Sequence, residues 1–430
     1  MGKKSMRNGE TRRIVFSRRS ETDRLVSSAT PEVPMTRSAH ILMVSIPAHG
    51  HVNPSLAVIT ELVARGHRVS YVNDASFRET VESTGAAFVP YPTTLPLGDD
   101  PNSWTDDPVG LQELFLEDAL AMWPVLLAAF ADDRPDLVLT DIAGFAGRAL
   151  GERLGVPVVQ LSPTYVGWEG FEEDLAEVFE AIRNGKGGAE YYRRFADWLA
   201  EAGATERDVD AFKARPQRAI ALIPRALQPN ADRVDEQRIT FVGPCFGDRG
   251  HQGEWRRPEG AEKVLLVSLG SAYTNQPAFY RACVQAFGDL PGWHTVLQVG
   301  KHTDLADLGE VPDTVEVHRW VPQLSVLAQA DAFVTHAGMG GSSEGLFHAV
   351  PMIAVPQGVD QFANADALVA HGVARRLDTD QATPEALRAA LLELVGDPAV
   401  AERLRELSAA GRAEGGTARA ADLIEAELAK

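Results

Sequence analysis

In the first half of the chain, short apolar runs alternate with a segment of helical spacing. Residues 41–46 and 69–72 are apolar runs of strand length. Between them we expect a helix that Asn53 caps, that begins at Pro54 and that ends before Gly66. Its apolar stripe consists of Leu56, Ile59, Leu62 and Val63. A strand, a helix and a strand in this order predict a parallel sheet, because two parallel strands need a crossover connection.

The second half repeats this alternation of strand-like and helical segments. Still in the first half, apolar runs at residues 137–140 and 156–161 extend the first predicted sheet. The repeated set comprises apolar runs at residues 264–269, 295–299, 315–317, 332–335 and 352–355, and helical patterns at 384–395 and 417–428. We therefore predict an α/β protein of two doubly wound Rossmann-like domains that face a central cleft. Ligands of such folds bind beyond the carboxyl ends of the strands.

Composition divides the chain into four parts. Residues 1–38 contain nine Lys or Arg and four Asp or Glu, and no apolar segment follows their two arginine pairs. We expect a disordered basic extension there instead of a secretion signal. Residues 39–240 form the first predicted domain and residues 258–430 the second. Residues 241–257, rich in Pro, Gly and charge, are the expected linker, and the last helix can pack back on the first domain.

Composition and charge also narrow the classes of function. With 45% hydrophobic and 23% charged residues, the chain of 430 residues has the composition of a soluble enzyme. Its net charge of −19 argues against nucleic acid as a partner and is compatible with a cationic small molecule. A well-solvated surface would explain the same charge more simply.

The cysteines and the apolar runs bear on the compartment. Cys245 and Cys283 are the only cysteines, too few for a disulfide framework or a thiolate metal site, which fits the reducing cytoplasm. The longest apolar run, residues 119–131, has 13 residues and contains Pro124, so it is too short to span a membrane. We expect a cytoplasmic protein with no membrane partner.

Residues 320–361 carry the most specific chemical pattern. They read WVPQLSVLAQADAFVTHAGMGGSSEGLFHAVPMIAVPQGVDQ. Residues 331–335 are a short apolar strand, residues 336–341 a glycine-rich turn, and residues 342–349 have the composition of a helix start. Exposed amides at a helix start and the helix dipole both favour a bound phosphate. No Lys lies in the turn, so a nucleotide bound there need not resemble ATP.

Polar and aromatic residues on either side of this turn suit a nucleotide sugar. Trp320 directly precedes a Val-Pro-Gln turn, where a flat indole can stack on a base and Val321 can offer backbone groups to the base edge. Gln323 is placed to bond the ribose or the base. Trp320 could instead belong to the core. Glycine-turn amides for the diphosphate are expected at Gly338, Gly340, Gly341 and Ser342.

Three further side chains in this segment can bond sugar hydroxyls. Glu344, in the first turn after the glycine loop, suits two ribose hydroxyls, although acidic residues also occur there to complement the dipole. Asp360 and Gln361, just beyond the strand at 352–355, suit adjacent hydroxyls of a sugar. Each signal is weak alone, but their order across 42 residues is specific.

In the first domain, the chemistry centres on His51. It follows the strand at 41–46, and Asp141 follows the strand at 137–140, so both lie at the ligand-binding edge of one sheet. A histidine can accept a proton from a hydroxyl, and it needs a carboxylate to orient it and stabilise its cation. His51 could instead bond loop backbone and Asp141 could cap the next segment. His49 more simply supports the loop.

An aromatic group follows the predicted strand at residues 156–161. Tyr165, Trp168 and Phe171 could line an apolar acceptor pocket. Their spacing is equally compatible with core packing.

At this point a family resemblance emerges. Residues 320–361 resemble the donor signature of family 1 glycosyltransferases of the GT-B fold, and HGHVNPSL, residues 49–56, resembles the acceptor-domain counterpart. The similarity extends from about residue 38 to the end and is closest to bacterial macrolide glycosyltransferases of the oleandomycin type. The phrases ELVARGHRVSY, FVGPCFGDR and ADLIEAEL carry that closer similarity. The first domain would then bind the acceptor and the second the nucleotide-sugar donor.

The resemblance also implies roles for individual residues. In the family, the histidine matched by His51 deprotonates the acceptor and the aspartate matched by Asp141 orients it. The other matches are His336 for the diphosphate, Ser271 for a phosphate, Glu344 for the ribose, Trp320 for the uracil, and Asp360 and Gln361 for the hexose. Plant relatives carry Trp, Asn and Ser where Met339, Gly340 and Gly341 stand here, so backbone amides must serve at these positions.

The implied reaction is inverting transfer of glucose from UDP-glucose to an amino-sugar hydroxyl of a macrolide antibiotic, which would inactivate it and give resistance. No Asp-X-Asp cluster lies near the donor motif, so we expect no metal and no cofactor. Three alternatives remain open: a broad-acceptor enzyme for flavonoids or other phenols, a UDP-sugar 2-epimerase, and a non-catalytic nucleotide-sugar sensor. The sequence sets no oligomeric state.

Overall fold

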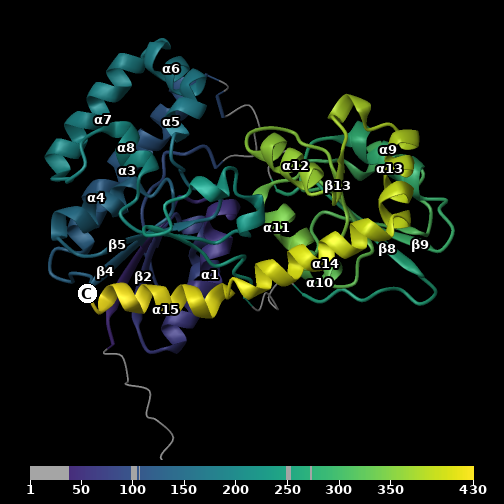
Figure 1. Cartoon of the computed structure of the whole chain (residues 1–430), viewed down its shortest axis with the longest axis horizontal. Helices are drawn as coiled ribbons and strands as arrows, with labels where there is room; N and C mark the ends of the chain where they lie inside the picture. Colours follow the sequence, from purple (N-terminus) through teal and green to yellow (C-terminus); the bar gives the residue numbers. More distant parts are fainter. Residues whose placement is uncertain (1–37, 98–103, 106, 248–252, 272–273) are drawn as a thin grey trace, which may run out of the picture. The chain divides into compact units, whose positions relative to one another are not determined.

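Two parallel sheets organise the protein (Figure 1). The structure is a computed structural model that describes residues 38–97, 104–105, 107–247, 253–271 and 274–430. The basic extension expected at residues 1–38 lies, except for Ser38, outside the described residues. The prediction of two doubly wound α/β domains is confirmed.

The first sheet has seven strands in the order β3-β2-β1-β4-β5-β6-β7, all parallel. Its strands are β1 (His40–Val44), β2 (Arg68–Asn73), β3 (Ala87–Pro90), β4 (Leu137–Thr140), β5 (Val158–Ser162), β6 (Ala219–Ala221) and β7 (Ile239–Phe241). The helical segments of this half are α1 (His49–Ala64), η1 (Ala75–Phe77), α2 (Arg78–Glu82), α3 (Pro108–Ala129), α4 (Phe145–Leu154), α5 (Phe171–Asp174), α6 (Ala176–Asn184), α7 (Gly188–Ala202), α8 (Val209–Ala214), η3 (Arg225–Leu227) and η4 (Ala231–Arg233).

Strand β1 shows why both faces of this sheet must be covered. Ile41 and Met43 pack in one apolar cluster, with residues of α1 and the last helix, while Leu42 and Val44 pack in another, with residues of α3, α4 and α7. Successive side chains of a strand point to opposite faces, and all four of these are fully buried. A run of apolar residues without polar alternation is what a parallel strand covered on both faces requires.

The second sheet has six parallel strands in the order β10-β9-β8-β11-β12-β13. They are β8 (Lys263–Ser268), β9 (Trp293–Gln298), β10 (Val315–His318), β11 (Ala332–Thr335), β12 (Met352–Ala354) and β13 (Ala374–Arg376). The helical segments are α9 (Pro277–Phe287), η6 (Leu305–Leu308), α10 (Gln323–Leu327), α11 (Met339–Phe347), α12 (Gln361–Ala370), η7 (Thr379–Gln381), α13 (Pro384–Gly396), α14 (Pro398–Ala413) and α15 (Gly416–Leu428). The pattern analysis did not identify α14.

In both sheets the chain first adds strands on one side of the first strand of that half and then continues on its other side. Strand β1 lies between β2 and β4, and β8 lies between β9 and β11. The segments that leave β1 and β4 therefore start side by side, and so do those that leave β8 and β11. Doubly wound sheets bind ligands at such switch points.

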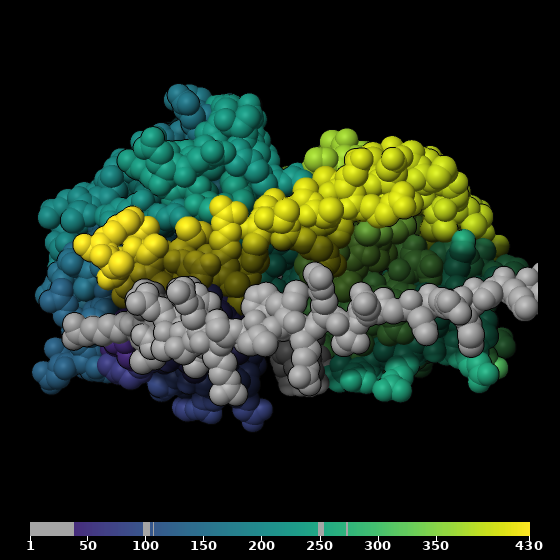
Figure 2. Space-filling model, turned by 60° about the horizontal axis from the view of Figure 1, so that its bottom comes forward, coloured from purple at the N-terminus to yellow at the C-terminus, as the bar shows by residue number. Residues whose placement is uncertain are grey.

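The last helix, α15, packs on the first helix of the chain. The chain turns between α14 and α15 at Gly415, whose φ of 101° favours glycine, and the Gly416 N–H donates to the Val242 carbonyl at 2.7 Å. In Figures 1 and 2 the yellow C-terminal segment runs from the second half of the chain along the first. Ala420, Ala421 and Ile424 of α15 join the apolar cluster of β1 and α1.

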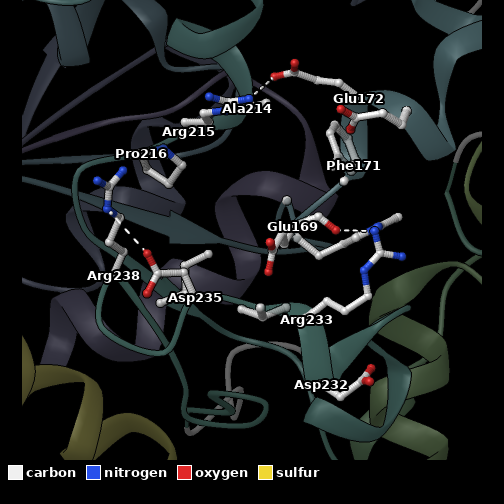
Figure 3. Close-up of a pocket in the computed structure, with 16 residues that line it drawn as sticks. Glu169, Phe171, Glu172, Ala214, Arg215, Pro216, Asp232, Arg233, Asp235 and Arg238 are labelled. Carbon is white, nitrogen blue, oxygen red and sulfur yellow. Dashed lines mark hydrogen bonds and ion pairs between the residues drawn. The ribbon is translucent and has the colours of Figure 1, made fainter.

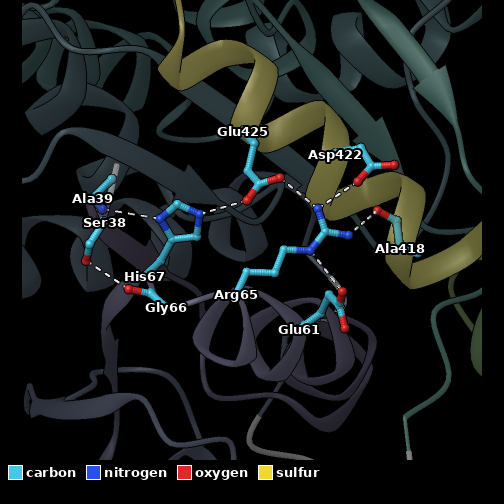
Figure 4. Close-up of polar contacts among 9 residues, drawn as sticks. All are labelled: Ser38, Ala39, Glu61, Arg65, Gly66, His67, Ala418, Asp422 and Glu425. Carbon is cyan, nitrogen blue, oxygen red and sulfur yellow. Dashed lines mark hydrogen bonds and ion pairs between the residues drawn. The ribbon is translucent and has the colours of Figure 1, made fainter. Parts of the chain in front are cut away.

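Polar contacts beside that cluster fasten α15 to α1 (Figure 4). The Arg65 guanidinium donates to Asp422 at 2.6 Å, to Glu425 at 2.7 Å and to the Ala418 carbonyl at 3.2 Å. The His67 Nε2 lies 3.0 Å from the other oxygen of Glu425. One carboxylate on the last helix thus holds two residues from the C-terminal end of α1.

Among the described helices, we find none that combines the length and the apolar character needed to cross a bilayer. The apolar run expected at residues 119–131 falls largely in α3, which contains Pro124 and the buried Asp118.

Candidate active site

His51 lies in the first turn of α1, next to the carboxylate of Asp141. Its Nδ1 is 3.0 Å from Asp141 Oδ2. The helix begins at His49, so the prediction that Asn53 caps a helix starting at Pro54 is wrong. Ala48 is already the N-cap, because its backbone is extended and its carbonyl accepts the N–H groups of the first turn. His51 is therefore fixed on a helix and not on a loop.

The Asp141 carboxylate is held in place by backbone groups. Oδ2 accepts from the Ile46 N–H at 3.1 Å, and Oδ1 accepts from the Ala143 N–H at 2.7 Å. The residue is 2% exposed. A carboxylate can only accept, so the proton of neutral His51 lies on Nδ1 and its Nε2 is free to accept a proton from another group.

In the second half of the chain, His336 follows β11, and its ring packs against the backbone of two glycines, Gly270 and Gly338. A Cβ at Gly338 would lie 2.4 Å from the His336 Nε2, and one at Gly270 would lie 2.6 Å from Cε1. Both positions must therefore be glycine for the ring to stay where it is. Burial lowers the pKa of His336 to about 4, so the ring is neutral at pH 7. Within the described residues its Nδ1 is buried without a hydrogen-bond partner.

Helix α11 begins directly after this histidine, with Gly338 as N-cap. The start at Met339 is three residues earlier than the start predicted at residue 342. Gly340 and Gly341 therefore lie in the first turn, whose N–H groups have no partner inside a helix. The Ser342 N–H already donates to the Gly338 carbonyl at 2.9 Å, so this amide is not available to a diphosphate.

Two glutamine side chains hydrogen-bond the residues expected to contact the base and the ribose. The Gln323 amide donates to Glu344 Oε2 at 2.5 Å, and Glu344 is 4% exposed. Glu344 lies in the second turn of α11 and not in the first, as a consequence of the earlier helix start. The Val321 N–H donates to Gln298 Oε1 at 3.0 Å, so only the Val321 carbonyl remains to meet a base edge.

Trp320 is not a core residue. It is 51% exposed and lines the same cavity as Gln323 and Glu344. An exposed indole at the wall of a cavity presents a flat surface on which a ring can stack.

Asp360 and Gln361 start helix α12. The Gln361 side-chain oxygen accepts the N–H groups of Gln357 at 2.8 Å and Gly358 at 3.2 Å, so only its NH₂ group is left for a ligand. Asp360 Oδ2 accepts from Asn364 Nδ2 at 3.0 Å. Burial raises the pKa of Asp360, while the Asn364 hydrogen bond and the charge of His51 act in the opposite direction. Asp360 and His51 line the same cavity.

A single cavity of about 490 Å³ brings these groups together. Both halves of the chain line it, as the switch points predict. The predicted residues among its walls are His51, Ser271, Trp320, Val321, Gln323, His336, Gly338, Gly340, Gly341, Glu344, Asp360 and Gln361. Asp141 stands behind His51, and Ser342 is buried beneath the first turn of α11.

The cavity also contains residues that the pattern analysis missed. Gln298 ends β9 and bonds Ser268 Oγ and the Gly270 carbonyl, each at 3.1 Å, in addition to Val321. A polar residue that ends an apolar strand on the ligand-binding edge is a signal that could have found it. Val359 is 69% exposed and has a φ of 46°, which is strained for a β-branched residue. Leu222, Ile223, Pro244 and Phe246 provide an apolar wall that no sequence motif marked.

The three aromatic residues predicted to line an acceptor pocket do not lie together in this cavity. Trp168 and Phe171 contact each other edge to face and line a different cavity, of about 600 Å³ (Figure 3). Charged pairs surround that space, including Arg215 with Glu172 at 2.6 Å and Arg238 with Asp235 at 3.5 Å. The Tyr165 hydroxyl donates to the side-chain oxygen of Asn364.

In the described part of the chain, no three His, Cys, Asp or Glu side chains are grouped so that they could hold a metal ion.

Comparison with known proteins gives a consistent result. Residues 221–413 match the family model described as UDP-glucoronosyl and UDP-glucosyl transferase. The chain is 58% identical over 395 residues to the oleandomycin glycosyltransferase of Streptomyces antibioticus, covering 91% of this chain and 92% of that protein. It is 34% identical to the NDP-glycosyltransferase YjiC of Bacillus licheniformis, with 91% and 98% covered. The crystal structure of the glycosyltransferase of kitacinnamycin superimposes with a TM-score of 0.85 at 53% identity, covering 91% of this chain and 100% of that one.

Proposed function

Since the chain belongs to the family 1 glycosyltransferases of the GT-B fold, we propose that it transfers glucose from UDP-glucose to a macrolide hydroxyl with inversion. The observation that carries this proposal is the shared cavity. A histidine oriented by a buried carboxylate faces, across that cavity, the exposed indole, the buried Glu344 and the amides of α11.

The reaction follows from these positions. His51 Nε2 takes the proton of an acceptor hydroxyl while that oxygen attacks the anomeric carbon of the donor sugar. The bond from the anomeric carbon to the UDP oxygen breaks, and the electron pair leaves with UDP. Asp141 stabilises the imidazolium that forms. Attack opposite the leaving group inverts the anomeric centre.

Charge develops on the diphosphate as the donor bond breaks. The N–H groups of Gly340 and Gly341, the dipole of α11 and the neutral ring of His336 lie at the wall where that charge would appear. Donors fixed in this way stabilise the transition state more than the ground state. We therefore propose that the enzyme needs neither a metal ion nor a cofactor.

The acceptor proposal rests on the close relative that acts on oleandomycin. At 58% identity over nearly the whole chain, similarity of the acceptor is a reasonable inference. The net charge of −19 also suits a cationic amino sugar. Glucosylation of an amino-sugar hydroxyl would inactivate such an antibiotic and give resistance.

We also propose a cytoplasmic location. Cys245 and Cys283 are both free thiols and both buried, which fits a reducing compartment.

Measuring UDP release with three acceptor conditions tests the proposal. We expect release from UDP-glucose with oleandomycin, much less with a flavonol and almost none without acceptor, and no effect of EDTA. Faster turnover of the flavonol would favour the broad-acceptor alternative. Conversion of UDP-glucose to another UDP-sugar without UDP release would favour the 2-epimerase, and UDP-sugar binding without any turnover would favour the sensor. A rate that falls with EDTA and returns with a divalent ion would refute metal independence.

A further inference from the structure

We infer that Tyr165 is a positioning residue for the donor sugar: its hydroxyl fixes the Asn364 amide, which in turn holds the Asp360 carboxylate in the cavity. This rests on the proposed function, because it takes Asp360 as a ligand of the donor sugar. Tyr165 belongs to the first half of the chain, whereas Asp360 and Asn364 belong to the second. The half that carries His51 would thus set the position of a sugar-binding group on the other half.

Two hydrogen bonds in series make this connection. The Tyr165 hydroxyl donates to Asn364 Oδ1, and Asn364 Nδ2 donates to Asp360 Oδ2 at 3.0 Å. Asn364 is fully buried. The ionised Asp360 carboxylate only accepts, so the Asn364 NH₂ group must face it, and the amide oxygen is left for the phenolic proton, which holds the other end of the amide. Burial raises the pKa of Tyr165, so its hydroxyl remains a donor at neutral pH.

The loop that carries Tyr165 is itself held rigidly. Gln228, 5% exposed, accepts from the Val166 N–H and donates to the Val166 carbonyl, each at 3.0 Å. Ser162 Oγ, at the end of β5, donates to the Thr164 carbonyl at 2.9 Å. A loop fixed at its two neighbouring residues can hold the Tyr165 hydroxyl at a defined point.

Helix α12 is tied to the first half of the chain at its other end as well. At the C-cap, His371 Nε2 donates to the Ala226 carbonyl of η3 at 2.7 Å. The two ties are separated by about two turns of helix, or roughly 10 Å at 1.5 Å per residue. Contacts near both ends restrict how α12 can tilt, and its first residues, Asp360 and Gln361, are the ones that line the cavity.

This connection also explains where the structure places Tyr165. As a wall of the acceptor pocket it would have to line the cavity, but it packs against an apolar cluster that contains residues of both halves, and its hydroxyl donates to Asn364. Asn364 is fully buried, so its amide needs hydrogen-bond partners within the protein.

Tyr165→Phe removes only the hydroxyl and tests the inference by calorimetric titration of UDP-glucose and of UDP. We expect the Kd for UDP-glucose to rise about three- to tenfold, the worth of one buried hydrogen bond, and the Kd for UDP, which has no hexose, to stay constant. In steady state, KM for UDP-glucose should rise more than kcat falls. Asn364→Asp, which places a second carboxylate beside Asp360, should show the same selectivity with a larger loss.

Tyr192→Phe is the matched control, because the Tyr192 hydroxyl also donates to a side chain, Asp210, but outside the cavity. It should leave both Kd values unchanged, and thermal unfolding of both variants shows whether they are folded. If Tyr165→Phe leaves the ratio of the two Kd values at the wild-type value, or weakens both ligands equally, the inference is wrong while the proposed function stands. If the wild-type protein binds neither UDP nor UDP-glucose, the proposed function and the inference both fall.

Discussion

His51 and Asp141 are 90 positions apart in sequence, yet their side chains meet at 3.0 Å because β1 and β4 are neighbours in the first sheet. The carboxylate accepts from two backbone N–H groups and contacts the imidazole. Among the described residues none bonds the His51 Nε2, and His51 lines the cavity that also contains Asp360. The pair therefore has the geometry of a base with its orienting acid.

For His51→Ala we expect glycosyl transfer to fall by about 10² to 10⁴, the usual contribution of a general base. UDP-glucose affinity should change little, because His51 belongs to the first half of the chain and the glycine-rich turn at His336 to the second. The measurement is UDP release with saturating acceptor, together with titration of UDP-glucose. His49→Ala is a neighbouring control, since His49 packs edge to face on Phe77 and is not bonded to Asp141 in the described structure. A His51→Ala enzyme near wild-type rate would refute the base assignment.

For Gly338→Ala we expect a loss of UDP affinity of tenfold or more, on the order of 1.4 kcal/mol. The backbone φ of −61° suits alanine, so the effect is purely steric: the new Cβ would meet the His336 Nε2 at 2.4 Å and push the ring away. Titration of UDP measures it. Gly396→Ala is the control, because a Cβ there would meet no atom within 4 Å. Equal UDP affinity in the Gly338 variant and the wild type would show that the ring does not contact the diphosphate.

For Trp320→Ala we expect UDP binding to weaken about three- to tenfold, as the loss of one aromatic stacking contact of 0.5–1.5 kcal/mol implies. Because the indole is 51% exposed, the free energy of unfolding should change far less than it does for a core tryptophan. Chemical denaturation and UDP titration of the same variant separate the two effects. Trp320→Phe should restore most of the affinity. A large loss of stability with unchanged UDP binding would mean that Trp320 is a packing residue after all.

The sequence was most informative where regular strands end in polar or glycine-rich segments. Strand β11 was predicted at its observed bounds, and the switch-point rule brought His51 to Asp141 and both to the cavity. The starts of α1 and α11 were predicted too late, because their N-cap residues, Ala48 and Gly338, make no side-chain capping hydrogen bond. No local pattern announces such a start.

What the sequence could not provide are contacts that depend on how the two sheets meet. Tyr165 was expected at an acceptor wall, since an aromatic residue after a strand gives no indication of its partner. Its actual partner, Asn364, lies 199 positions away on a helix of the second sheet. The Gln298 contact to Val321 is similar: both residues were visible in the sequence, but their pairing depends on the path of the chain after β9.

Glu425→Gln tests whether the hydrogen bonds of Glu425 on α15 with Arg65 and His67 stabilise the fold. The hydrogen bonds of His67 and Arg65 hold the pKa of Glu425 below its usual 4.5, although burial acts against them. A carboxyl with a lowered pKa contributes stability that is present above the unfolded pKa and is lost as the pH falls through the folded pKa. We therefore expect the free energy of unfolding of the variant to be lower by about 1.5–3 kcal/mol at pH 7, which is the contribution of a hydrogen bond to a charged group. The difference from the wild type should shrink below pH 4.5.

Urea denaturation at a series of pH values measures this difference. Asp422→Asn is the matched control, because Asp422 bonds the same guanidinium but its side chain is 66% exposed, so its loss should cost only about 0–1 kcal/mol. A Glu425 variant as stable as the wild type at pH 7, or one whose deficit grows as the solution is acidified, would show that apolar contacts of Ala420, Ala421 and Ile424 alone hold the last helix. Helix α15 packs on α1, which carries His51. Loss of the Glu425 contacts should therefore also lower the temperature at which glycosyl transfer is lost.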